Sequence, residues 1–390
     1  MLSKANIPTL GMWETPFYFY DLDLLDRTLS ACKQALDRHG YSAHFALKAN
    51  AESRILDRIR EAGFGADCVS GNEVALALRH QFDPQKIVFA GVGKSDREIR
   101  IALDAGIFSF NCESIPEMEV IAALAASMGT TARIALRINP DVDAHTHHYI
   151  STGKKENKFG ISPWMFEDAL TIIRNNPSLE LIGLHFHIGS QITDLSVFGT
   201  LCKRVNELQQ WFVDRGMQLP HLNLGGGLGI NYQNPELAPI PDFTTWFEQV
   251  HQHLQPLPGQ QIHFEPGRSI VAQCGHLITR VLYIKEGLES RFMILDAGMN
   301  DLIRPALYQA RHRIENISAQ LRNTTQDECL SYEVVGPVCE SSDLWENSAL
   351  LPKTLRGDLI AIHSAGAYGQ VMGMRYNQRD LAPAHYSDEL

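Results

Sequence analysis

One lysine occupies a position where an amine could do chemistry. Lys48 interrupts FALKAN, an otherwise apolar run, and a buried ammonium is costly unless it is paired or modified. Desolvation frees the amine of such a lysine to form a Schiff base with a carbonyl cofactor. The alternative is a lysine at the end of a strand that reaches solvent, and this residue alone does not decide between the two.

Two further segments could bind a phosphate. Gly225–Gly227 close a β-type run, and backbone N–H groups without side chains in the way can hold this anion. Ser190, in HIGSQ, offers a hydroxyl to the same anion, and a tight turn is the alternative for the glycines. GVGKSD (91–96) ends like a Walker A loop, but Val88 stands where the first glycine is needed, so we expect a strand-to-helix loop.

The turn EPGR (265–268) places a carboxylate and a guanidinium three residues apart. Beside Lys48 and the glycines, Glu265 could pair with a protonated ring nitrogen of a cofactor, and Arg268 could bind an anion. The alternative is a surface ion pair at an ordinary turn.

The histidines do not predict a metal site. We expect only one of His185 and His187 to face the mouth of a barrel, which leaves no paired ligands. His145, His147 and His148 stand in a loop without carboxylates at ligand spacing. One histidine as a flat stacking surface, or as a packed side chain, is favoured instead.

These residues lie in a chain that alternates between β-type runs and helical patterns. Eight such alternations predict parallel strands closed into a (β/α)8 barrel, with a doubly wound open sheet as the alternative. Ser114 and Glu117 predict a capping box at the start of one helix. The eight β-type runs are 44–50, 65–70, 87–91, 107–113, 132–140, 179–189, 221–227 and 262–271.

In such a barrel the carboxyl ends of the strands share one mouth. Polar residues at most of the eight ends are harder to explain as solvated termini than a single one would be. They are Lys48, Asp67, Glu113, Arg137, Asn139, His187, Ser190, Gly225–Gly227, Glu265 and Arg268.

After residue 271 the sequence becomes β-rich, with few long helical patterns. FYFYDLD (17–23) predicts one more strand before the barrel begins. We therefore expect an α/β plus β protein: a barrel over 25–270, and a β-rich, Greek-key-like domain built from both chain ends, 1–24 and 271–390. Residues 311–330 remain unassigned.

Composition limits the classes of partner. The 390 residues suffice for two or three domains at roughly 150 residues each. A balance of 34 basic to 45 acidic residues gives a formal net charge of −11, which argues against general binding to nucleic acid or anionic membranes. Seven scattered cysteines predict neither disulfides nor zinc, and no apolar run predicts a membrane span or signal peptide, so we expect a cytoplasmic protein.

Ten segments, in order along nearly the whole chain, resemble the alanine racemase-like, barrel-type decarboxylases that use pyridoxal phosphate. Within these, the diaminopimelate decarboxylase family is the most similar. One segment would be modest evidence, but ten in sequence are highly specific. They are TPFYFYDLDLL, FALKAN, TGKKENKFGI, GLHFHIGSQI, LNLGGGLGI, EPGRSIV, DAGMNDLIRPALY, GPVCESSD, GAYG and RYNQR.

The resemblance implies pyridoxal phosphate as cofactor. Lys48 would form the Schiff base, His187 would stack on the pyridine ring and Glu265 would pair with its nitrogen. The other cofactor-binding residues would be Asp67, Ser190, Gly225, Gly226, Gly227, Gly267, Arg268 and Tyr368.

The resemblance also implies decarboxylation of meso-2,6-diaminopimelate to L-lysine and carbon dioxide, the last step of lysine biosynthesis. Cys339 would donate a proton. In this family it reaches the site from the other subunit together with Glu340, so a homodimer is implied. The substrate-binding residues would be Arg268, Arg304 and Tyr308 on the distal carboxylate, Glu340 on the distal amine, and Tyr368.

Other functions stay open. One alternative is a decarboxylase of another basic amino acid or of a carboxylated polyamine. Such a substrate lacks the distal carboxylate and would leave the arginines unpaired, and buried polar groups left unpaired can reject an analogue by a factor of roughly 10⁴–10⁵. A racemase of this barrel class would not need the acid in GPVCESSD, and a cofactor-free regulatory homologue would lack Lys48. The segment TGKKENKFG (152–160) borders the barrel mouth, and we expect it to close over substrate.

Overall fold

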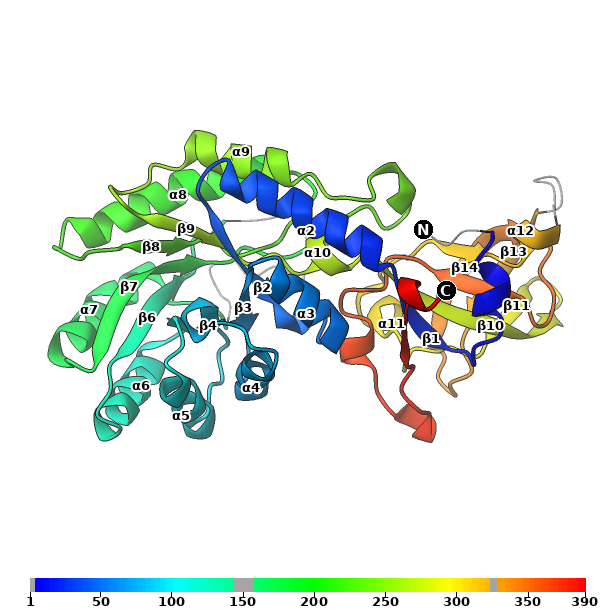
Figure 1. Cartoon of the computed structure of the whole chain (residues 1–390), viewed down its shortest axis with the longest axis horizontal. Coiled ribbons are helices and arrows are strands. Elements are labelled where there is room, and N and C mark those ends of the chain that lie inside the picture. The colour runs from blue at the N-terminus through cyan, green and yellow to red at the C-terminus, as the bar shows by residue number, and fades with distance from the viewer. Residues whose placement is uncertain (1–3, 143–157, 323–328) are drawn as a thin grey trace. The chain divides into compact units, whose positions relative to one another are not determined.

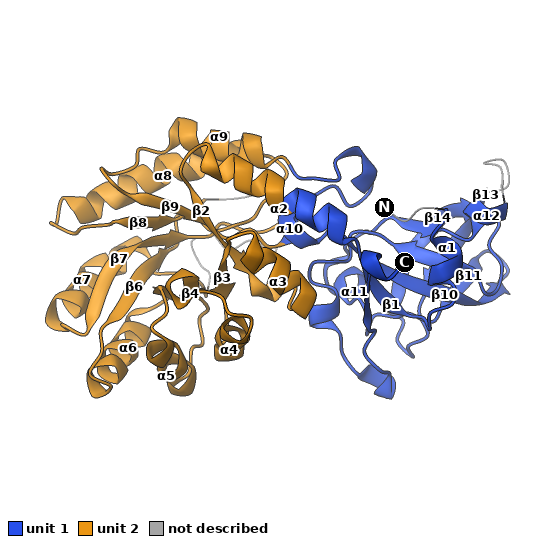
Figure 2. Ribbon diagram, in the orientation of Figure 1, with its two compact units in different colours: residues 1–28, 230–241, 268–390 blue, residues 29–229, 242–267 orange. Residues whose placement is uncertain are grey.

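The computed structural model describes residues 4–142, 158–322 and 329–390 (Figure 1). The chain divides into two compact units, coloured separately in Figure 2. One unit comprises residues 29–229 and 242–267, and the other comprises residues 1–28, 230–241 and 268–390. Residues 230–241, which we expected in the barrel, group with the β-rich unit.

The first unit is a closed barrel of eight parallel strands, which confirms the predicted (β/α)8 class. Each predicted β-type run overlaps one strand. Pairing of Ser42 with His263 and of Ala43 with Phe264 closes the ring. The strands are β2 (Ser42–Ala46), β3 (Gly65–Cys68), β4 (Ile87–Phe89), β5 (Ser109–Cys112), β6 (Ala132–Ile138), β7 (Leu179–Phe186), β8 (His221–Asn223) and β9 (Gln261–Phe264).

Helices alternate with these strands and surround the barrel (Figure 1). They are α2 (Leu22–Asp37), α3 (Ser53–Glu61), α4 (Gly71–Arg79), α5 (Asp96–Ala105), α6 (Ile115–Ser127), α7 (Phe166–Asn175), α8 (Ser196–Val213) and α9 (Phe243–His253). At α6 the Ser114 hydroxyl accepts from the Glu117 N–H, as a capping box requires. The Glu117 carboxylate, however, accepts from the N–H of Glu113 at 2.7 Å, one residue before the cap.

The second unit is built around a mostly antiparallel sheet in the order β12-β15-β10-β11-β13-β14, with β1 and β16 attached through β10. Its strands are β1 (Phe17–Tyr20), β10 (Gly275–Glu286), β11 (Arg291–Leu295), β12 (Ile314–Asn316), β13 (Cys329–Val335), β14 (Leu344–Pro352), β15 (Leu359–Ile362) and β16 (Ala384–Tyr386). Its helices are the short α1 (Ile7–Leu10), α10 (Arg268–Val271), α11 (Arg304–Tyr308) and α12 (Ala319–Arg322).

Both chain ends contribute to this β-rich unit, as the sequence predicts. β1 pairs antiparallel with β10 and parallel with β16. The aromatic side chains of Phe17 and Phe19 pack with Ile7, Leu10 and Ile278 in a buried cluster, so burial of the FYFY run anchors the N-terminal segment. The unassigned stretch 311–330 contributes β12 and α12, while its residues 323–328 lie outside the described part.

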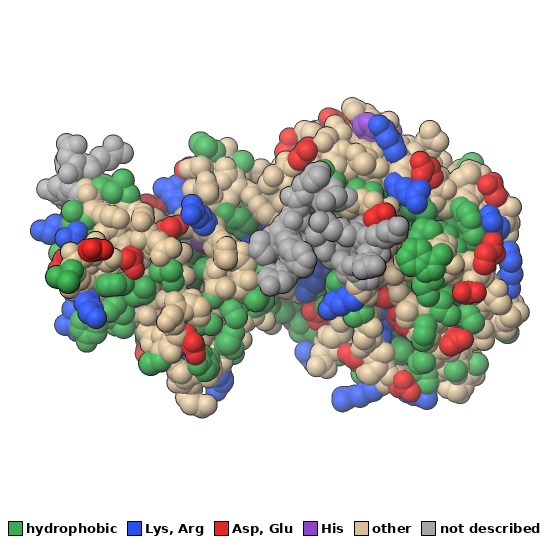
Figure 3. All heavy atoms as spheres, turned by 180° about the vertical axis from the view of Figure 1, so that it is seen from behind, with side chains coloured by type: hydrophobic (Ala, Val, Ile, Leu, Met, Phe, Trp, Pro, Cys, Tyr) green, Lys and Arg blue, Asp and Glu red, His purple; other side chains and the backbone are tan. Residues whose placement is uncertain are grey.

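Figure 3 shows acidic and basic side chains interspersed over one face of the molecule, in keeping with the small excess of acidic residues. A membrane-spanning helix, which must be long and apolar, is not found in the described part of the chain.

Candidate active site

Lys48 and Asp67 lie together at the carboxyl ends of β2 and β3. Lys48 sits in a short 3₁₀ turn, Leu47–Ala49, directly after β2, and its Nζ is 3.3 Å from Oδ2 of Asp67. The Asp67 side chain is completely buried. Burial first, and then the nearby Glu265 carboxylate, raise its pKa to about 7 against the opposing charge of Lys48.

Glu265 follows β9 and is held from three other strands. Its carboxylate accepts from Nδ2 of Asn223 at 2.7 Å, from Nδ2 of Asn111 at 3.4 Å and from Nε2 of His185 at 3.1 Å. Burial acts to raise the Glu265 pKa, but His185 and then Lys48 outweigh this and hold the pKa below its usual range. Glu265 therefore remains an anion under conditions in which Asp67 takes up a proton.

His187 presents a neutral ring at the same end of the barrel. The N–H of Gly226 donates to its Nδ1 at 3.3 Å, which leaves the ring proton on Nε2. Burial, followed by Lys48 and Arg137, lowers the pKa of His187 well below its usual value. A flat, uncharged imidazole is suited to stacking on an aromatic ring.

The expectation that only one of His185 and His187 faces this end was wrong. Residues two apart in a strand share a face, and His185 contacts Glu265 while His187 contacts Gly226. No group of three or more His, Cys, Asp or Glu side chains suited to a metal is found in the described ranges. The loop histidines His145, His147 and His148 lie outside those ranges.

The glycines after β8 are required by close backbone contacts. A Cβ at Gly225 would lie 2.3 Å from the carbonyl oxygen of Phe186, and one at Gly226 would lie 2.1 Å from that of Glu265. Gly225 also has a φ of +70°, which side chains disfavour. The turn can therefore present amides at the barrel mouth only as glycine. Gly267 packs similarly closely, its Cβ position being 3.1 Å from those of Ala46 and Ala49.

These residues fit a phosphorylated, aldehyde-bearing aromatic cofactor. Lys48 supplies the amine, His187 a flat ring, Glu265 a carboxylate and the glycines a cradle free of side chains. In addition, Oδ1 of the buried Asp67 accepts no hydrogen bond from any described residue. A buried acceptor without a donor is costly, so this atom indicates a donor supplied by a bound group.

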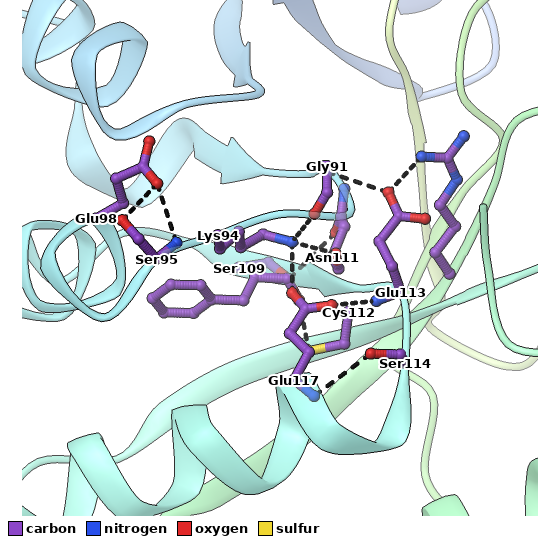
Figure 4. A network of polar contacts seen from close by, with 12 residues as sticks. Gly91, Lys94, Ser95, Glu98, Ser109, Asn111, Cys112, Glu113, Ser114 and Glu117 are labelled. Carbon is purple, nitrogen blue, oxygen red and sulfur yellow. Dashed lines mark hydrogen bonds and ion pairs between the residues drawn. The ribbon is translucent and has the colours of Figure 1, made fainter. Parts of the chain in front are cut away.

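Lys94, Glu113 and Glu117 belong to the network of polar contacts drawn in Figure 4. Arg137 Nη1 is 2.5 Å from Oε1 of Glu113, which also accepts from the N–H of Gly91. The Walker-like lysine, Lys94, is buried and bonds to the Gly91 carbonyl and to Glu117. Its ammonium is therefore used within the protein, which confirms that GVGKSD is a strand-to-helix loop.

A second cluster lies in the β-rich unit, where two buried arginines face one tyrosine. Nη1 of Arg268 donates to the hydroxyl of Tyr232 at 2.5 Å, and the Arg304 guanidinium lies 4.6 Å from the centre of the same ring. Tyr368 lies 4.8 Å from the Arg268 guanidinium, and Tyr308 ends α11. Burial, with Arg268 adding to it, lowers the pKa of Arg304.

Within the described residues no carboxylate forms an ion pair with Arg304, although its side chain is almost fully buried. A buried cation is costly without a counter-charge. The cluster therefore has the chemistry of an anion-binding site.

Cys339 and Glu340 lie on the surface of the β-rich unit, between β13 and β14. The Cys339 thiol is free and exposed, and its backbone N–H donates to Oδ1 of Asn377 at 3.3 Å. The Glu340 carboxylate accepts from the hydroxyl of Tyr376 at 2.5 Å. Ser190 lies in the loop after β7, and residues 152–157 of the segment expected to close over substrate lie outside the described part.

Five residues of the two clusters were not proposed from the sequence: His185, Asn111, Asn223, Tyr232 and His312. Asn111 and Asn223 are polar residues within short apolar strands, and His185 stands two positions before His187, so strand alternation could have revealed them. Tyr232 and His312 lie outside strands and carry no such signal.

Comparison with known proteins follows this geometry. Residues 22–272 match the family model for the pyridoxal binding domain of pyridoxal-dependent decarboxylases. The chain belongs to the pyridoxal-dependent decarboxylase family. The expected enzyme class and the pyridoxal phosphate cofactor are thereby confirmed.

Individual pyridoxal-dependent decarboxylases are similar over nearly the full chain. A diaminopimelate decarboxylase of Bacteroides thetaiotaomicron is 52% identical over 378 residues, covering 97% of this chain and 96% of the relative. The crystal structure of a diaminopimelate decarboxylase from Helicobacter pylori complexed with L-lysine has a TM-score of 0.90 and 41% identity, covering 98% of this chain and 94% of that chain. A lysine/ornithine decarboxylase of Vibrio vulnificus, at 24% identity and a TM-score of 0.82, shares the fold.

Proposed function

We propose that this enzyme decarboxylates meso-2,6-diaminopimelate to L-lysine and carbon dioxide. The observation that carries the proposal is the pair of buried arginines, Arg268 and Arg304, around Tyr232. A basic amino acid whose one carboxylate is on the reacting carbon offers these arginines no anion at its far end, whereas diaminopimelate carries a second carboxylate there. The names of the similar enzymes support the same substrate.

In this proposal the barrel holds the cofactor. Bound pyridoxal phosphate supplies the electron sink that decarboxylation requires. Lys48 binds it covalently, His187 supports the face of its ring, and the anionic Glu265 keeps a proton on its ring nitrogen. Asp67 offers an unsatisfied acceptor, and the phosphate is bound by Ser190, Gly225, Gly226, Gly227, Gly267 and the start of α10 at Arg268.

The β-rich unit binds the rest of the substrate. Arg268, Arg304 and Tyr308 bind the distal carboxylate, with Tyr368 beside Arg268. This carboxylate remains in the product.

A homodimer with shared active sites is part of the proposal. Glu340 binds the distal amine and the Cys339 thiol donates the proton that replaces the lost carboxylate, both from a second subunit. Their exposure supports this, because an exposed thiol and carboxylate are available to another chain. All seven cysteines are free, which supports a location in the reducing cytoplasm.

The test is product release from the purified enzyme supplied with pyridoxal phosphate. We expect L-lysine from meso-diaminopimelate and no product from ornithine, arginine or lysine offered in parallel. Arg304→Leu should lower kcat/KM for diaminopimelate by at least about a hundredfold, because it removes a buried charged partner of the distal carboxylate. Turnover of ornithine or lysine at a comparable rate would refute the substrate assignment.

A further inference from the structure

Tyr232 contacts both buried arginines of the β-rich unit. It belongs to residues 230–241, the segment between β8 and α9 that groups with this unit. Its hydroxyl accepts from Nη1 of Arg268, while its ring lies 4.6 Å from the Arg304 guanidinium and 5.8 Å from that of Arg268. One side chain therefore fixes the positions of two like charges that would otherwise repel each other.

His312 holds the second arginine through a hydrogen bond. Its Nδ1 is 2.8 Å from the carbonyl oxygen of His363, and its Nε2 is 2.9 Å from Nη1 of Arg304. A carbonyl only accepts, so Nδ1 carries the proton and Nε2 accepts from Arg304. Burial, followed by the charge of Arg304, lowers the pKa of His312 to about 3, so the imidazole stays a neutral acceptor at physiological pH.

Tyr232 and His312 also contact each other, with ring centres 4.9 Å apart and an angle of 70° between the planes. Both contact the guanidiniums without adding a negative charge. A carboxylate in either place would cancel a charge and compete with the ligand, whereas a phenol and a neutral imidazole do neither. The His312 contact uses one of the five N–H donors of the Arg304 guanidinium.

We propose that Tyr232 and His312 are positioning residues that hold Arg268 and Arg304 as a preassembled receptor for the carboxylate that stays in the product. The inference rests on the proposed function, because it takes that carboxylate as the ligand. Preassembly spares the ligand the free energy of ordering two long side chains, so it raises affinity for molecules that carry the carboxylate and not for others.

The binding of two diamines distinguishes a loss of affinity for the carboxylate from general damage to the binding site. L-lysine and 1,5-diaminopentane differ only in the carboxylate, and their affinities for the holoenzyme can be measured by titration calorimetry. His312→Phe keeps a ring but removes the acceptor, and we expect it to weaken L-lysine binding about tenfold to a hundredfold while 1,5-diaminopentane changes less than about twofold. His312→Gln, whose amide oxygen can accept from Arg304, should recover most of the loss.

Tyr232→Phe gives an independent measurement, since it removes one hydroxyl and keeps the ring against Arg304. We expect about a tenfold weaker binding of L-lysine. In both variants KM for diaminopimelate should rise more than kcat falls, because the carboxylate does not react. The visible absorbance of the bound cofactor should be unchanged.

The outcomes are separable. A wild-type enzyme that binds L-lysine no better than 1,5-diaminopentane would refute the proposed carboxylate site itself. If the wild type binds L-lysine more tightly than 1,5-diaminopentane, the inference fails when His312→Phe and Tyr232→Phe keep the wild-type ratio of the two affinities. It also fails when His312→Gln binds L-lysine as weakly as His312→Phe does. Equal losses for both diamines would show a packing role only and would also overturn it.

Discussion

His185 Nε2 lies 3.1 Å from Oε2 of Glu265 inside the barrel, and both side chains are buried. The carboxylate can only accept, so His185 donates. This contact is the largest of the charge effects that hold the Glu265 pKa below its usual range. If Glu265 pairs with the cofactor as we propose, His185 acts on the cofactor through it.

Removal of this donor should make Glu265 easier to protonate. In His185→Leu the pKa of Glu265 should rise, because burial then acts with only Asn111, Asn223 and more distant cations against it. We expect the acidic limb of the pH profile of kcat to shift to higher pH by about one unit. His185→Gln, which can still donate, should move it less. Identical, unshifted profiles for both variants would remove His185 from this role.

Lys48→Ala should abolish the visible absorbance of the lysine-bound cofactor and reduce turnover by at least about 10³-fold. The same change takes away the cation next to Asp67, so the pKa of this buried carboxyl should rise further. Lys33→Ala, which changes an exposed helical ion pair, is the matched control and should leave absorbance and rate unchanged. A retained absorbance band would mean that another lysine binds the cofactor.

Cys339→Ala should retain the cofactor absorbance but slow kcat by about 10²–10⁴, the range expected when a positioned proton donor is lost. Cys329→Ala, in β13 of the same unit, controls for removal of a thiol and should turn over normally. Stopped-flow absorbance with diaminopimelate would show whether the slow step follows substrate binding. A near-normal rate for Cys339→Ala would exclude it as the acid.

Sharing of active sites between subunits can be tested by mixing two inactive variants. If Cys339 serves the site of a second subunit, unfolding and refolding Lys48→Ala together with Cys339→Ala should recover about a quarter of wild-type activity. Half of the random dimers are then mixed, and each has one intact site out of two. No recovery, with dimers confirmed by ultracentrifugation, would place both residues in a site within one chain.

Acid should destabilise the barrel through a row of histidines on β2, β9 and β8. His263 lies 3.1 Å from both His44 and His221, ring nitrogen to ring nitrogen. Burial, then the two neighbouring histidines, lowers the pKa of His263 to about 2, and burial also lowers that of His44. Below pH 6.5 the unfolded chain binds protons that the folded chain does not, so stability falls as pH falls.

Each such buried histidine contributes a slope of about 1.4 kcal/mol per pH unit well below pH 6.5. His263→Gln should therefore reduce by about that amount the pH dependence of the unfolding free energy measured in urea between pH 6 and 5. Above pH 7.5 both proteins should show little dependence from this source. An unchanged slope in the variant would contradict the buried, neutral state of His263.

The sequence by itself determined the barrel, and it singled out Lys48 and Glu265 as candidates for the cofactor site. The strand-and-helix alternation is local, since each run carries its own pattern of apolar residues, and eight of them specify closure. Lys48 was recognisable because a buried ammonium within an apolar run is costly unless it is paired or modified. The β-rich unit was predicted from the same kind of local pattern at both chain ends.

The partners of those residues were decided only by the tertiary structure. Asn111, His185 and Asn223 surround Glu265 because barrel closure brings β5, β7 and β8 to β9, and no spacing along the chain encodes that meeting. Likewise Tyr232 joins the arginines because residues 230–241 leave the barrel for the β-rich unit. Local patterns specify elements, but hydrogen bonds between side chains far apart in sequence depend on how the elements close on one another.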